Sequence, residues 1–300
     1  MQNRILPALP LDEWEDTQHT LHLFMQIVGK IRMSAFPRAN HWWHVPLYVS
    51  SRGLGTHLIP FGNRAVEINF DFIDHRLTLQ CSDGNTQGFL LENLSVAGFY
   101  SRLMWILAEL NIQVTIKAEP YDVPFSDVPF LEDEIHASYD RTAVEKYWQL
   151  LLFVNGVFER FRGRYLGKST PVHLFWHHAD LALTRFSGNA APPFEGGSRA
   201  DQDAYSHEVI SFGFWAGDQN TRQPAFYAYI YPEPEGITDM PLKPESAHWN
   251  TDYGYSMAFL SYEDIRQSSD PEASLLEYLQ HCYQGLARLA KWDVEALDLS

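Results

Sequence analysis

The sequence has few cysteines, few basic residues and no long hydrophobic run. Two cysteines, Cys81 and Cys282, are too few for a disulfide framework or a thiolate zinc site. With 22 Lys and Arg against 38 Asp and Glu, the formal net charge is −16 at pH 7, which argues against binding to nucleic acid or to an anionic membrane surface. No run reaches the roughly 18 apolar residues of a membrane-spanning helix, and the first residues lack a long apolar signal core. We therefore expect a cytoplasmic protein without nucleic-acid or membrane partners.

Motifs that mark common catalytic sites are also missing. The chain contains no glycine-rich phosphate loop ending in Lys-Ser/Thr, no G-x-S-x-G, no H-E-x-x-H and no paired C-x-x-C. This disfavours P-loop nucleotide hydrolases, serine hydrolases with a nucleophile elbow and helical zinc peptidases. A site assembled from distant strands is still compatible with the sequence.

The hydrophobic residues, 45% of the chain, are arranged with the periods of helices and strands. Apolar residues spaced three and four apart predict helices, at 12–35, 95–110, from 140 to beyond 158, and 270–292. Alternating apolar and polar residues predict strands, at 44–50, 65–72, 75–81, 172–176, 180–186, 205–215, 225–231 and, more weakly, 255–260. The connections between strands are too short for parallel crossovers, so the sheets should be antiparallel.

The order helix, strand meander, helix occurs twice. We therefore predict an α+β fold with two similar halves, at 1–118 and 140–300. They are joined by an acidic connector at 119–139, which Pro120, Pro124 and Pro129 prevent from forming a long helix.

Local similarities suggest that the two halves arose by internal duplication. Residues 23–29 (LFMQIVG) resemble 150–156 (LLLFVNG), and the alternation of Ile68, Phe70 and Phe72 matches that of Ile210, Phe212 and Phe214. The second half then carries an inserted loop at 189–204. Because loops longer than about 12 residues in compact domains are often lids, we expect this loop to gate a site.

Five segments together resemble a bacterial family that is catalogued as a domain of unknown function. They are HWWHVPLY at 41–48, NFDFIDH at 69–75, PVHLFW at 171–176, TRFSG at 184–188 and AYSHEV at 204–209. The resemblance covers nearly the whole chain and implies a bacterial, single-chain protein. It implies no activity, cofactor or catalytic residue.

Polar residues of the second half form the candidate site. Glu208 is expected on the same side of its strand as Ile210 and Phe212, the apolar side. Its carboxylate should therefore be buried, either in an ion pair with Arg185 or in a functional role. On the opposite face we expect His207, His173, Tyr227 and Tyr229. The candidate catalytic residues are His207, Glu208 and Arg185, and the candidate ligand-binding residues are His173, Tyr227 and Tyr229.

Three classes of function follow from this set. If His173, His207 and Glu208 converge, they would suit a divalent metal, zinc or iron, in an enzyme acting on a small molecule. Alternatively, the tyrosines would line a non-catalytic pocket for a flat or sugar-like ligand. The third class is a structural or interaction module, such as a homodimer. We predict one principal pocket lined by His173, Arg185, His207 and Tyr229, with Glu208 near it.

Overall fold

The computed structural model describes residues 6–299 and contains two antiparallel six-stranded sheets. The first sheet has the order β1 (Tyr48–Val49), β2 (Gly53–Gly55), β4 (Arg64–Asp71), β5 (Arg76–Cys81) and β6 (Thr86–Leu90), with β3 (Ile59–Phe61) paired to β4. The second sheet has the order β11 (His248–Asn250), β12 (Met257–Ser261), β10 (Ala225–Tyr231), β9 (His207–Trp215), β8 (Asp180–Ala190) and β7 (His173–Phe175). The predicted α+β class with antiparallel sheets is confirmed.

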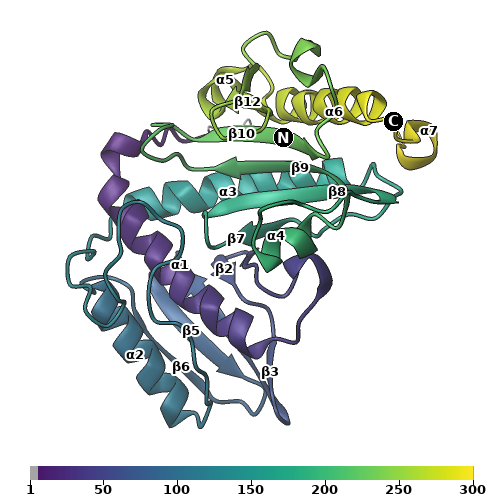
Figure 1. Ribbon diagram of the computed structural model, residues 1–300. Coiled ribbons are helices and arrows are strands. Elements are labelled where there is room, and N and C mark those ends of the chain that lie inside the picture. Colours follow the sequence, from purple (N-terminus) through teal and green to yellow (C-terminus); the bar gives the residue numbers. More distant parts are fainter. Residues whose placement is uncertain (1–5, 300) are drawn as a thin grey trace.

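Helices cover one face of each sheet (Figure 1). On the first sheet lie α1 (Glu15–Ala35) and α2 (Val96–Glu109), whose Phe24 and Phe99 rings stack 4.0 Å apart. On the second lie α3 (Arg141–Arg162), α5 (Tyr262–Gln267) and α6 (Pro271–Leu289). Two short helices, α4 (Arg199–Ala204) and α7 (Val294–Leu297), complete the set, together with single turns of 3-10 helix at Leu11–Glu13, Asn40–Trp42 and Ile237–Asp239.

Three predicted helix starts are confirmed by their caps. The side chain of Ser95 accepts a hydrogen bond from the Gly98 N–H, and Asp140 and Asp270 cap α3 and α6 in the same way. Each cap satisfies a backbone donor that a helix leaves unpaired at its start. Pro271 takes the first position of α6, where its missing N–H costs nothing.

One local prediction differs from the structure. The strand expected at 44–50 is reduced to β1, because His41 and Trp42 adopt positive φ and close a turn of 3-10 helix. The N-terminal segment contacts the second half: the Tyr262 hydroxyl donates to the Pro7 carbonyl at 2.8 Å, and the Leu11 N–H donates to the Arg222 carbonyl.

The two sheets meet where β1 approaches β7. The Leu47 N–H donates to the Leu174 carbonyl, and the Leu174 N–H donates to the Leu47 carbonyl, both at 2.8 Å. Nearby, Trp176 packs on α1 so closely that a Cβ at Gly29 would lie 2.1 Å from its ring. Helix α1 therefore packs against both halves of the chain (Figure 1).

Candidate functional site

The second sheet presents a row of tyrosines on the face opposite its helices. Along β10, Phe226, Ala228 and Ile230 are buried in the core, and Tyr227, Tyr229 and Tyr231 alternate with them and stay partly exposed. We call the surface formed by Tyr205, Tyr227, Tyr229, Tyr231 and Tyr255 the tyrosine face. Its position confirms the alternation expected at 225–231.

One tyrosine reaches across a neighbouring strand to a carboxyl group. The Tyr227 ring lies over Gly213 of β9, where an added Cβ would come within 2.1 Å of the ring. Its hydroxyl donates a 2.5 Å hydrogen bond to Oδ2 of Asp180 at the start of β8. Glycine is required at position 213 because any side chain there would displace the ring.

The other tyrosines are linked to this pair. The hydroxyls of Tyr205 and Tyr229 are 2.9 Å apart, and the Tyr227 and Tyr229 rings stack at 5.9 Å. Tyr255, 43% exposed, meets Tyr229 edge-on at 5.3 Å. The result is a contiguous surface of aromatic rings and hydroxyls.

The inserted loop packs against one end of this surface. Phe194 stacks on Tyr205 at 4.9 Å, and the Tyr231 hydroxyl donates to the Pro192 carbonyl at 3.0 Å. The last residues of the loop form α4, which packs beside the turn at His41. The loop predicted from composition thus forms a wall of the tyrosine face, whereas its role as a gate stays a prediction.

Burial disfavours the charged forms of the groups of this site. It raises the pKa of the Asp180 carboxyl, although part of the residue reaches solvent. It also raises the pKa of Tyr227 and Tyr229 well above the usual value, and nearby Asp180 adds to the effect at Tyr227. Neutral tyrosines act as hydrogen-bond donors and acceptors, and they are poor general bases at neutral pH.

The structure does not bring the two predicted histidines together. His173 pairs with Ala182 and His207 pairs with Ala190, eight residues further along β8. At about 3.3 Å per residue, this places them roughly 25 Å apart. His207 instead contacts His41, with ring centroids 5.3 Å apart. Within residues 6–299, no three His, Cys, Asp or Glu side chains are placed to hold a metal ion, so the structure gives no support to a metal site at His173, His207 and Glu208.

Arg185 and Glu208 also lie elsewhere than expected. Arg185 points to the helix side of the sheet, where its guanidinium is 3.6 Å from the Phe161 ring centroid and 4.3 Å from that of Tyr283. It therefore does not line a pocket with His207 and Tyr229. Glu208 accepts hydrogen bonds from Ser187 and Asn189 rather than from Arg185, and it borders a separate pocket of about 270 Å³ beside the end of α6.

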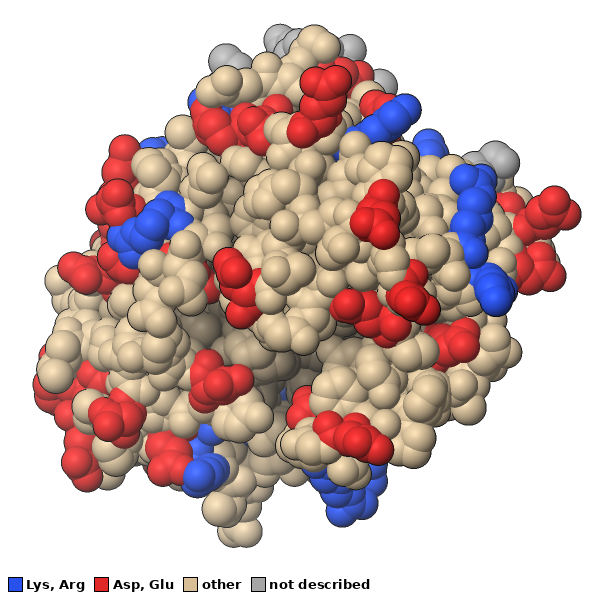
Figure 2. Space-filling view, turned by 45° about the horizontal axis from the view of Figure 1, so that its top comes forward, with Lys and Arg blue, Asp and Glu red and all other residues tan. Residues whose placement is uncertain are grey.

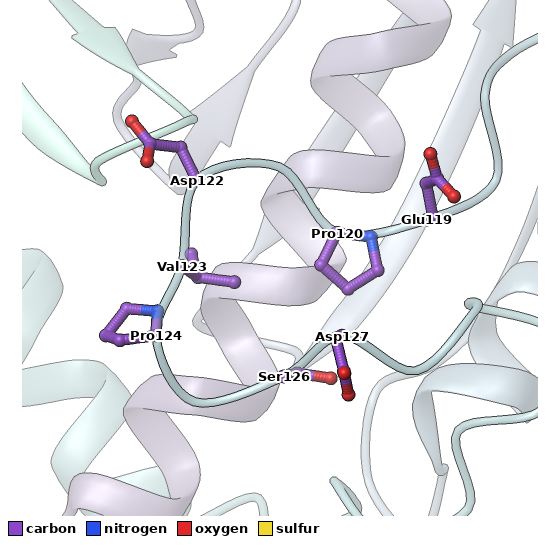
Figure 3. A pocket seen from close by; sticks show the side chains of 7 residues that line it. All are labelled: Glu119, Pro120, Asp122, Val123, Pro124, Ser126 and Asp127. Atoms are coloured by element: carbon purple, nitrogen blue, oxygen red, sulfur yellow. The ribbon is translucent and has the colours of Figure 1, made fainter.

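A larger pocket, of about 470 Å³, lies at the connector where it crosses α1. Three of its seven lining residues are acidic, Glu119, Asp122 and Asp127. Figure 3 shows that their carboxylates point in different directions, while Pro120 and Val123 face the middle of the loop. This arrangement does not form a cation site.

The comparison with known proteins identifies a family. A family model described as a family of unknown function (DUF5996) matches residues 6–299. The chain belongs to this family. No curated protein and no solved structure matches it. None of the described helices is both long enough and apolar enough to cross a membrane.

The sequence analysis did not identify Asp180 as a residue of this site. A usable signal was present: Gly213 interrupts a strand of bulky residues, and an isolated glycine in a strand often marks the close approach of another group. The partner across the sheet could not be identified, because it depends on strand register. Figure 2 shows a broad area with few charges on the face in view, bordered mainly by acidic side chains.

Proposed function

We propose that this protein binds a small, neutral molecule with a flat or sugar-like ring on the tyrosine face. The observation that carries the proposal is the Tyr227–Asp180 hydrogen bond across Gly213. This hydrogen bond holds the Tyr227 ring flat on the sheet. Polar groups beside it can form hydrogen bonds with the hydroxyls of a ligand ring. Aromatic walls with a few fixed polar groups are typical of small-molecule sites.

The chemistry of the face favours binding over catalysis. Because their pKa is raised, Tyr227 and Tyr229 keep their hydroxyl protons at neutral pH, so they can donate hydrogen bonds and provide no phenolate to act as a base. The hydroxyls of Thr184 and Ser211, 2.8 Å apart on the same face, add further polar groups without a nucleophile–base pair. We therefore place the non-catalytic binding protein ahead of the metal-dependent enzyme.

A ligand screen tests this proposal. Saturation-transfer NMR with monosaccharides, disaccharides and flat aromatic metabolites should identify compounds that receive magnetisation from the protein. For a compound found in this way, Tyr227→Phe and Tyr229→Phe should each weaken binding about 3- to 10-fold, the effect of one hydrogen bond. Tyr100→Phe in α2, remote from the face, is the matched control and should bind as wild type. If no compound binds, or if the three variants bind alike, the proposal fails.

The internal duplication also belongs to our proposal. It is supported by the meander β1-β2-β4-β5-β6 in one half and β7-β8-β9-β10-β12 in the other, each preceded and followed by helices. The reciprocal hydrogen bonds of Leu47 and Leu174 join the first strands of both meanders. Profiles built separately from the two halves of aligned family members should match each other at the strands, and profiles that do not match would contradict a duplication. A homodimer and a cytoplasmic location stay predictions.

A further inference from the structure

Among the described residues, three cationic side chains are buried without a carboxylate in contact, in a chain that has 38 acidic residues. Within residues 6–299, none of Lys30, Arg32 and Arg185 forms an ion pair within 4.0 Å. Aromatic rings surround Lys30 and Arg185: the Lys30 Nζ lies about 6 Å from the rings of Tyr121, Phe130 and Trp176. Burying a charge is costly unless it is compensated.

Arg32 differs because three histidines, His44, His57 and His173, also lie near it. It lies at the end of α1, 2% exposed, and one of its terminal nitrogens donates to the Thr56 carbonyl. Its Nε is buried and finds no hydrogen-bond partner in the described part of the chain. Its guanidinium carbon lies 5.5 Å from the Tyr48 ring centroid.

His173 also lies near Tyr48. Its ring centroid is 6.3 Å from that of Tyr48, the residue is 0% exposed, and neither ring nitrogen is hydrogen-bonded within residues 6–299. Burial, with a smaller effect of the Arg32 charge, lowers the pKa of His173 to about 3. A neutral imidazole with two unused nitrogens and a guanidinium with an unused donor therefore both lie near the Tyr48 ring.

Two further histidines lie around Arg32. Burial lowers the pKa of His44 and of His57, and the Arg32 charge contributes in both cases. His57 stacks on Tyr48 at 3.8 Å, and the Phe36 ring lies 4.3 Å from the guanidinium carbon. We call the region around Arg32, Tyr48 and His173, where the two halves meet, the seam. Its Arg32 guanidinium has no described carboxylate within 4.0 Å to balance its charge.

We propose that this seam binds a small oxyanion, held by the Arg32 guanidinium and the His173 imidazole. An oxyanion would supply the missing countercharge and accept hydrogen bonds from Arg32 Nε and from one His173 nitrogen. Planar guanidinium groups with free donors are suited to carboxylate and phosphate oxygens. The site lies on the same face of the second sheet as the tyrosines, because register aligns His173 with Ala182, Gly213 and Tyr227, but it is at the outer strand β7, beside α1.

Titration calorimetry with inorganic phosphate and with acetate, at constant ionic strength, tests the proposal and distinguishes a phosphoryl ligand from a carboxylate. Wild-type protein should bind one of the two ions saturably at one site. Arg32→Gln should weaken this binding about tenfold or more, the loss of a charge-assisted hydrogen bond, and His173→Phe should also weaken it. The control Arg52→Gln changes an exposed guanidinium held by Asp71 and Asp74 and should bind as wild type.

A measurement on the wild-type chain covers the case in which these variants do not fold. The imidazole ¹⁵N signals of His173 should shift along the same saturation curve as the calorimetric binding. Saturable binding of neither ion, as expected if the seam holds only water, would overturn the proposal. So would equal binding by folded Arg32→Gln and wild type, or His173 signals that do not move.

Discussion

The Tyr227 ring covers Gly213, and its hydroxyl donates to Asp180 on the next strand, so one side chain spans three strands of the second sheet. This contact fixes the orientation of the tyrosine face. It depends on the absence of a side chain at position 213.

Gly213→Ala should therefore destabilise the protein. The new Cβ would lie 2.1 Å from the Tyr227 ring, and displacing the ring should lower the free energy of unfolding by about 1–3 kcal/mol, as overpacking does. The control is Gly156→Ala in α3, where an added Cβ meets nothing within 4 Å. There alanine should stabilise the helix by about 0.5–1 kcal/mol. Urea unfolding measures both effects, and equal changes at the two sites would contradict the packing described for Tyr227.

His22 should make the stability depend on pH. Burial lowers its pKa from 6.5 to about 4, although the carbonyls of His177 and Trp176 accept its hydrogen bonds. Between these values the unfolded chain binds a proton that the folded chain does not, so stability falls as the pH falls from 6.5 to 4. The loss from this residue is up to about 3 kcal/mol, at about 1.4 kcal/mol for each pKa unit.

Unfolding of wild type and His22→Gln at several pH values measures this contribution. The glutamine amide can donate to the same carbonyls but does not titrate, so the variant should lose less stability on acidification. An NMR titration should show the His22 ring neutral down to about pH 4. A ring that titrates near 6.5 would disprove its burial behind residues 176–177.

Arg185 and Glu208 should be energetically independent. Arg185 is held by the Phe161 carbonyl and by aromatic rings, and Glu208 by Ser187 and Asn189. A double-mutant cycle with Arg185→Lys and Glu208→Gln should give a coupling energy within about 0.5 kcal/mol, as for residues that share no partner. Arg185→Lys alone should destabilise, because an ammonium group cannot stack on the rings as a guanidinium does. A clearly larger coupling energy would indicate that Arg185 and Glu208 form the ion pair considered from strand alternation.

The amides of Leu47 and Leu174 should exchange slowly with deuterated water. Their reciprocal hydrogen bonds join the two sheets, and both residues are fully buried. Their amides exchange slowly if these hydrogen bonds break only when large parts of the structure unfold. Hydrogen-exchange NMR or mass spectrometry checks this, with the exposed turn at 82–85 as a rapidly exchanging reference. Rapid exchange at Leu47 and Leu174 would mean that the halves separate easily.

The alternation of residues 225–231 was sufficient to predict the tyrosine row, because period two in a strand places every second side chain on the same face. Periodicity does not determine how far one strand is shifted along its neighbour. His173 and His207 were expected to converge, but the pairing with Ala182 and Ala190, with an irregularity after Phe186, separates them along β8. The surroundings of Arg32 depend on how α1 packs against both halves, which a single sequence does not reveal.

The most direct test of the account is to map where a bound compound contacts the protein. Tyrosine rings labelled with ¹³C should be observed by NMR while a compound from the saturation-transfer screen is added. We predict that the signals of Tyr227, Tyr229 and Tyr255 shift along one saturation curve, while those of Tyr100 and Tyr121 stay in place. Shifts confined to tyrosines outside the tyrosine face, or saturable binding that leaves all three signals unmoved, would contradict the proposed function.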